Sequence, residues 1–152
     1  MLVLATASLA VSSGASGSAT SAASTVTFSG SVNGPLNGIG GGPECTQKFG
    51  SVLGRLSTGE LVSIGWTNVT SPKTSFPSHS ATFFSVQIAY GDSIGALEWQ
   101  ANQTTGKGTL TMSGPSSKPH VSANVTLKQV RGAHSPARLA RGPLTVKGAW
   151  SC

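Results

Sequence analysis

The sequence predicts an all-β protein, built as a single antiparallel β-sandwich of about seven to nine strands closed by one disulfide. Three observations lead to this fold class. Apolar and polar residues alternate over many short segments; Gly, Ser and Thr are abundant; and no segment keeps a helical apolar period. Only 9% of the 152 residues are charged, and Ser, Thr and Gly are poor helix formers. The length corresponds to one domain.

The strand prediction rests on a period of two from residue 24 onward. In residues 24–33, Val26, Phe28 and Val32 share one side, while Ser and Thr occupy the other. The same alternation marks six further segments, which are 60–69, 81–90, 96–101, 108–114, 120–129 and 143–152. Such segments are typical of half-buried antiparallel strands. Turn-forming residues predict loops between them, including the run GIGGGP at 38–43 and the Ser/Pro-rich stretches 70–80 and 113–119.

The two cysteines, Cys45 and Cys152, are predicted to form a disulfide. Cys152 is in phase with Leu144, Val146 and Trp150, so its side chain is expected to point into the core. In an exported protein two cysteines usually pair, whereas two free thiols would fit a reducing cytosol. A bridge closing a loop of about 100 residues is worth up to about 4.7 kcal/mol in the chain-entropy model, and it would hold the last strand in the sheet.

Residues 1–23 are predicted to be a signal peptide, and residues 24–152 the mature domain. Residues 2–11 form an apolar run of signal-peptide length, and small residues follow, with cleavage expected after Ala19 or Ala23. No basic residue precedes Lys48, so we expect the true start codon to lie upstream. No cysteine follows the apolar run, which argues against a lipoprotein anchor. The expected location is extracellular or in the cell envelope.

The charge distribution is lopsided and predicts an anionic partner. The net charge is +6, and all four acids (Glu44, Glu60, Asp92 and Glu98) precede residue 99. The later segment 128–143 is a long basic loop whose candidate anion-binding residues are Lys128, Arg131, His134, Arg138 and Arg141. Its expected partner is an anionic envelope polymer or lipid surface, and export disfavours nucleic acid. The alternative is a solubilising loop that discourages pairing at a sheet edge.

One motif raises an enzymatic alternative. GDSIG at 91–95 matches the G-x-S-x-G pattern of hydrolases, with Ser93 as nucleophile. That pattern needs a strand before the serine and a helix after it, but the following residues read as a strand. Only Glu98 could serve as the acid, and only His120 or His134 as the base. A tight hairpin turn explains the motif better, so we predict a non-enzymatic protein and keep a small serine hydrolase as the less favoured alternative.

Neither a metal nor a cofactor is predicted. The three histidines (His79, His120 and His134) have no ligand spacing. A carbohydrate-binding module is the main alternative function, and it would need at least two exposed aromatic residues among Trp66, Trp99, Trp150 and Tyr90. The three tryptophans fall on inward-facing positions, which favours a core role.

Two short motifs carry a family resemblance: the cysteine after the first strand, in ECTQ, and the final strand ending in WSC. With the apolar leader and the Ser/Thr/Gly-rich strands, they resemble small secreted or envelope β-proteins of actinobacteria, including the mycobacterial lipoprotein-antigen family. The chain differs from the lipoprotein members because it lacks the lipidated cysteine. The resemblance implies an envelope or extracellular location and a non-catalytic binding or surface-display role.

Overall fold

The computed structural model describes residues 24–90, 93–132 and 142–152, and this part of the chain is entirely β. It contains ten antiparallel strands and no helix. The strands are β1 (Thr25–Gly30), β2 (Gly34–Cys45), β3 (Phe49–Leu56), β4 (Leu61–Thr67), β5 (Lys73–Phe76), β6 (Phe83–Tyr90), β7 (Ser93–Ala101), β8 (Lys107–Ser113), β9 (His120–Arg131) and β10 (Leu144–Ser151). The predicted all-β class is confirmed.

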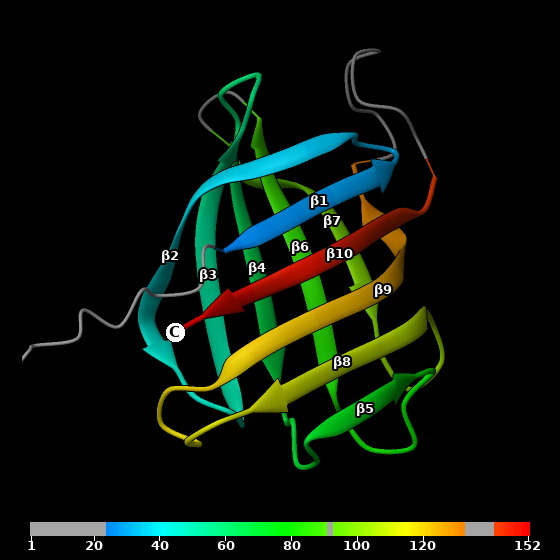
Figure 1. Cartoon of the computed structure of the whole chain (residues 1–152). Helices are drawn as coiled ribbons and strands as arrows, with labels where there is room; N and C mark the ends of the chain where they lie inside the picture. Colours follow the sequence, from blue (N-terminus) through cyan, green and yellow to red (C-terminus); the bar gives the residue numbers. More distant parts are fainter. Residues whose placement is uncertain (1–23, 91–92, 133–141) are drawn as a thin grey trace, which may run out of the picture.

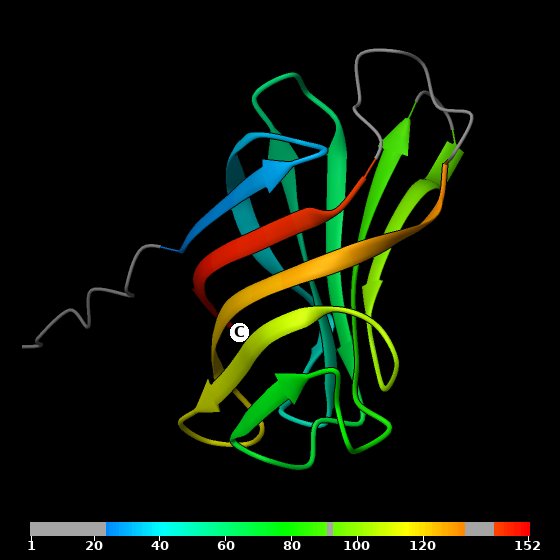
Figure 2. The same ribbon diagram turned by 90° about the vertical axis from the view of Figure 1, so that its right-hand side faces the viewer.

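The strands form two layers that cross steeply. One layer contains β3, β4, β6 and β7, and the other contains β1, β10, β9, β8 and β5 (Figure 1). Strand β2 bends from the second layer into the first at one side of the molecule. In the view turned by 90°, the two layers face each other across the core (Figure 2). Two facing layers are what a sandwich would also show, so hydrogen bonding at the layer edges decides between the two architectures.

The hydrogen bonds close the sheet into an eight-stranded barrel, so the sandwich prediction is wrong. The barrel order is β1-β2-β3-β4-β6-β7-β9-β10, and β10 pairs with both β9 and β1. Strand β9 makes closure possible because its last residues pair with β7, while residues 120–126 pair with β8. Strands β8 and β5 continue the sheet outside the barrel. Alternation predicts which side chains point inward, but it carries no information about whether the edges meet.

Three strands fall outside the segments that the alternation predicts: β2, β3 and β5. The prediction of a turn at GIGGGP is wrong, because this run lies inside β2. Its pairing with β3 shifts register between Asn37 and Gly40 and again between Gly41 and Cys45. Such irregularities, together with glycine, let a strand bend sharply. Strand β2 bends from one layer into the other through a run that is rich in glycine. Because glycine has no side chain, this run shows no apolar alternation, and alternation does not predict the strand.

The barrel interior is filled by apolar side chains, and the three tryptophans are among the most buried. Trp66, Trp99 and Trp150 are each 1% exposed or less. The rings of Trp66 and Trp150 pack with centroids 6.1 Å apart, and Trp66 Nε1 donates a hydrogen bond of 2.9 Å to the carbonyl of Thr46. This confirms the prediction of a core role for the tryptophans.

The predicted disulfide joins Cys45 at the end of β2 to the terminal residue, Cys152. Their Cα atoms are 5.6 Å apart, and both side chains pack against the core. The amide of Cys152 also donates to the carbonyl of Pro119, at 3.2 Å. The end of β10 is therefore tied both to β2 and to the residue preceding β9.

One glycine permits the close approach of β1 and β10. Gly148 has a φ of 149°, and a Cβ atom there would lie 1.9 Å from the carbonyl oxygen of Thr25 on the neighbouring strand. Any side chain at this position would push apart the two strands that close the barrel.

We therefore expect Gly148→Ala to destabilise the fold by about 2 kcal/mol or more, from backbone strain and the steric clash. Gly40→Ala is the matched control, because a Cβ there meets nothing within 4 Å and its φ is not positive. Urea unfolding measures both variants. Equal losses of stability would contradict the proposed role of Gly148.

We expect removal of the disulfide, by Cys45→Ser with Cys152→Ser, to lower the free energy of unfolding by up to about 4.7 kcal/mol. Unfolding curves of the variant and of the unreduced protein give this difference. Adding reductant to the variant supplies the control, because it should change nothing further. Two thiols that alkylate in the folded, unreduced protein would refute the bridge.

Candidate functional site

The outward side chains of β1, β10, β9, β8 and β5 form one continuous surface, which we call the cationic face. Alternate residues of these strands, such as Val146, Val125 and Leu110, are buried in the core. The residues between them therefore point outward. They include Lys73 on β5, Lys107 on β8, Lys128 on β9 and Lys147 on β10, all exposed.

The strand register arranges the cationic face in rows that are rich in hydroxyl groups. Three of these rows read Ser29–Thr145–Thr126–Lys107, Thr27–Lys147–Asn124–Thr109–Ser75, and Thr25–Ala149–Ser122–Thr111–Lys73. Neighbours within rows make contact, because the hydroxyls of Thr126 and Thr145 are 2.8 Å apart. In the next row, His120 Nδ1 lies 2.9 Å from Ser151 Oγ. The face therefore offers lysines set among Ser, Thr and Asn side chains.

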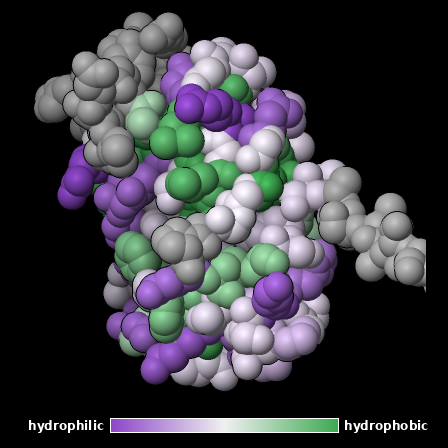
Figure 3. Space-filling view, turned by 90° about the vertical axis from the view of Figure 1, so that its left-hand side faces the viewer, coloured by the Kyte–Doolittle hydropathy of each residue, from purple (hydrophilic) through white to green (hydrophobic). Residues whose placement is uncertain are grey.

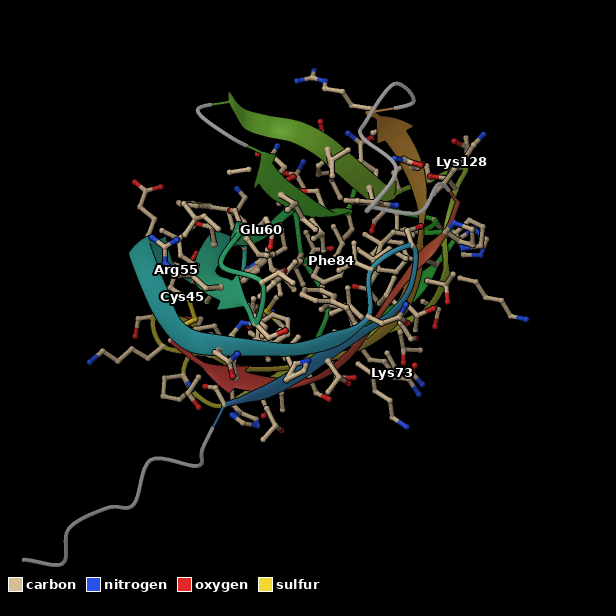
Figure 4. All side chains as sticks on the ribbon, turned by 90° about the horizontal axis from the view of Figure 1, so that it is seen from above. Cys45, Arg55, Glu60, Lys73, Phe84 and Lys128 are labelled. Atoms are coloured by element: carbon tan, nitrogen blue, oxygen red, sulfur yellow. A yellow bond between two sulfur atoms is a disulfide. The ribbon has the colours of Figure 1, made fainter. Side chains whose placement is uncertain are left out.

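The acids of the described residues lie on strands other than those of the cationic face, but Glu98 is close to Lys128, because Gln100 pairs with Lys128 and Glu98 lies two residues before Gln100. Glu44 is on β2, Glu60 precedes β4 and Glu98 is on β7. Glu98 forms an ion pair with Arg131, not with a lysine of the face. Seen from above, Lys73 and Lys128 lie on the opposite side of the molecule from Arg55 (Figure 4). Among the described residues, no strand of the face carries a carboxylate, and Glu98 is an acid near its edge.

The register also sets the spacing of the lysines. Lys107 is opposite Thr126, and Lys128 lies two residues further along β9. Neighbouring strands are about 4.8 Å apart and two residues along a strand span about 6.7 Å, which places the Cα atoms of Lys107 and Lys128 about 8 Å apart. The same geometry gives about 12 Å between Lys107 and Lys147. The charges are therefore spread over the sheet, with one closer pair.

That closer pair borders a hollow of about 390 Å³. Lys107 and Lys128 line it together with Thr126, Gln129, Gly142 and Pro143, among others. The wall at Gly142 is firmly held. Its carbonyl accepts hydrogen bonds from Trp99 Nε1 at 2.9 Å and Ser31 Oγ at 2.5 Å, and its amide donates to Gln129 Oε1 at 3.1 Å. We call this depression the lysine hollow.

The residues predicted to bind anions lie in different surroundings. Lys128 lies on the cationic face and in the lysine hollow, whereas Arg131 is paired with Glu98, Nε to Oε2, at 3.9 Å. Glu98 is nearly buried and also accepts a 2.7 Å hydrogen bond from Gln100, whereas the side chain of Arg131 is 68% exposed. His134, Arg138 and Arg141 lie outside the described residues. Lys107 and Lys147 belong to the cations that follow residue 98, and alternation places both on the outward side of their strands. Only the strand register shows that they share a surface.

Of the residues proposed for the hydrolase alternative, the structure describes the strands of Ser93, Glu98 and His120, and His134 lies outside the described residues. Ser93 begins β7 and pairs with Tyr90 on β6, and β7 continues as a strand where a nucleophile elbow needs a helix. Glu98 lies on the same strand and is engaged by Arg131 and Gln100. His120 contacts Ser151 on the cationic face, in the other layer. Strands β6 and β7 pair in antiparallel fashion on either side of residues 91–92, which lie outside the described residues.

Other kinds of site find little support among the described residues. Burial of the three tryptophans leaves no aromatic platform for a sugar among them. No group of His, Cys, Asp and Glu side chains in residues 24–90, 93–132 and 142–152 could hold a metal ion. Nor does this part of the chain contain a helix long and apolar enough to cross a membrane. A second hollow, of about 620 Å³, is lined mainly by hydroxyl and amide side chains with Lys48.

No protein-family model, curated protein or solved structure matches this chain. The resemblance to actinobacterial envelope β-proteins therefore stays a prediction. Function has to be argued from the geometry of the chain itself.

The hydrogen bond from Trp99 to the carbonyl of Gly142 can be tested by substitution. We expect Trp99→Phe to cost about 1 kcal/mol more than Trp150→Phe, because only the first change removes a hydrogen bond. Trp150 is the matched control, since it is equally buried and its Nε1 has no partner in the described structure. Chemical unfolding of both variants gives the difference. A larger loss for Trp150→Phe would contradict the anchoring role.

Proposed function

We propose that this chain is an exported, non-enzymatic protein of the cell envelope or extracellular space that binds an anionic polymer through its cationic face. One observation carries the proposal: four lysines on neighbouring strands share a surface with no carboxylate among its described positions. A surface that carries only positive charges attracts polyanions.

The spacing of the charges favours a partner with repeated charges over a single small ion. Each of the four lysines lies about 8 to 14 Å from its nearest lysine, so they cannot all contact one ion, but they can meet successive charges of a polymer. The hydroxyl groups between them can donate hydrogen bonds to the same oxyanions. Because the lysines are exposed, salt should screen the attraction, with a Debye length of about 8 Å at physiological ionic strength.

The distribution of apolar residues favours a polymer over a lipid surface. The large exposed hydrophobic residues of the described part are Phe49, Leu53 and Val130. Phe49 and Leu53 belong to β3 in the other layer, and the side where β2 and β3 lie shows the hydrophobic surface in Figure 3. Val130 lies near the end of β9, beyond the lysine rows. Apolar side chains that enter the membrane strengthen the binding of a basic surface to lipid, and the rows of the cationic face offer only Ala149.

The disulfide and the apolar run at residues 2–11 support the proposed location. Disulfides persist in oxidising compartments and are rare in the cytosol. Amino-terminal sequencing of protein recovered from culture fluid or envelope would test export and the cleavage site together. Recovery of the uncleaved chain from the cytosol alone would refute the location.

We expect the double variant Lys73→Gln/Lys147→Gln to bind an immobilised polyanion, such as polyphosphate, about thirtyfold more weakly, at about 1 kcal/mol for each lysine near an anionic surface. The control Lys48→Gln/Arg55→Gln loses the same charge outside the face and should change affinity much less. Binding of the unmodified protein should weaken steadily as salt rises. Salt-independent binding, or equal losses in both double variants, would contradict the proposal. Tighter binding to acidic vesicles than to polyanions would reassign the partner to lipid.

A further inference from the structure

We propose that the lysine hollow binds one phosphate group, with the polyol or sugar carbons attached to it, from a phosphate-containing polymer. This inference rests on the proposed function and deepens it, because it names the repeating unit that the cationic face recognises. The hollow differs from the rest of the face in combining two cations, a hydroxyl group and a fixed wall within about 390 Å³.

The two lysines are placed to share one anion. Lys107 and Lys128 come from neighbouring strands and line the same hollow. Their Cα atoms are about 8 Å apart by strand geometry, which is within reach of two flexible four-carbon side chains that converge on a group between them. Neither lysine forms an ion pair with a carboxylate of the described residues. An anion bound there would therefore neutralise two charges that have no ion-pair partner among the described residues.

A hydroxyl donor is also available. The hydroxyls of Thr126 and Thr145 are 2.8 Å apart, and one of them donates to the other. Two hydroxyls carry two hydrogens, and this contact uses only one. When Thr145 donates, Thr126 keeps a hydrogen for a ligand in the hollow that it lines. Two ammonium groups and one hydroxyl give several donors around a single oxyanion.

The donor set suits phosphate better than carboxylate. Carboxylate recognition favours the planar, two-pronged guanidinium of arginine, whereas lysine acts as a point charge that serves the tetrahedral oxygens of phosphate well. Among the described residues that line the hollow, Lys107 and Lys128 are the only cations. The nearby Arg131 is directed to Glu98.

The size and lining of the hollow indicate more than a bare ion. A volume of about 390 Å³ falls within the range of small-molecule sites, about 300 to 1,000 Å³. Pro143 and the methylene groups of the two lysines can contact the carbons of a polyol or sugar. The bonds from Trp99, Ser31 and Gln129 hold Gly142 in place before a ligand arrives, so binding requires little ordering of this wall.

The test compares two polymers that carry one charge per unit, poly(glycerol phosphate) and polygalacturonate. We expect Lys107→Gln/Lys128→Gln to weaken binding of poly(glycerol phosphate) at least tenfold more than Lys73→Gln/Lys147→Gln does. Both double variants remove two charges from the same face, so the excess reports on the hollow. For polygalacturonate the two variants should lose affinity equally. Thermal unfolding of each variant checks that the fold is intact.

A second readout uses the unmodified protein and a small probe. Adding glycerol 3-phosphate should shift the amide NMR signals of Thr126, Lys128 and Gly142, and leave those of Lys73 and Ser75 on the same face unchanged. Equal losses in both double variants for both polymers would overturn the hollow as a site while leaving the proposed function standing. An equally selective loss for polygalacturonate would overturn the preference for phosphate. Failure of the unmodified protein to bind either polymer would overturn both proposals.

Discussion

The pairing of β10 along both of its edges is the interaction on which the rest of the structure depends. Leu144–Ala149 pair with β1, and Leu144–Ser151 pair with β9, so this last strand turns an open sheet into a barrel. Without it, the inward side chains of two crossing layers would share no enclosed core. Because a terminal strand tends to fray, its position is secured twice: by Gly148, which permits the close approach to β1, and by the disulfide to Cys45.

The same closure creates the candidate binding surface. The cationic face spans β1, β10, β9, β8 and β5, and β10 lies between β1 and β9 and carries Lys147. The alternation that sends Val146 and Trp150 into the core sends Thr145 and Lys147 outward. The same alternation therefore buries the core side chains and exposes the lysines of the cationic face. At the end of β9, Arg131 is paired with Glu98 on β7.

The sequence is sufficient for the class, the core and the bridge. Alternation placed Trp66, Trp99 and Trp150 inward and brought Cys152 into phase with them, and the structure agrees. The sequence does not predict a strand that is rich in glycine, and it does not predict which strands pair. Strand β2 bends through a glycine run that has no side-chain pattern, and edge closure leaves no trace in alternation. Similarly, Lys73 and Lys147 lie more than seventy residues apart in the chain, and only strand pairing unites them on one face.

Amide hydrogen exchange along β10 tests the central claim most directly. If β10 is hydrogen-bonded on both edges and closes the barrel, the paired amides from Leu144 to Trp150 should exchange only through global unfolding, as slowly as those of the central strand β4. Exchange of these amides through local opening, at the rates of a fraying terminus while β4 stays protected, would show that the barrel is open and would contradict the account.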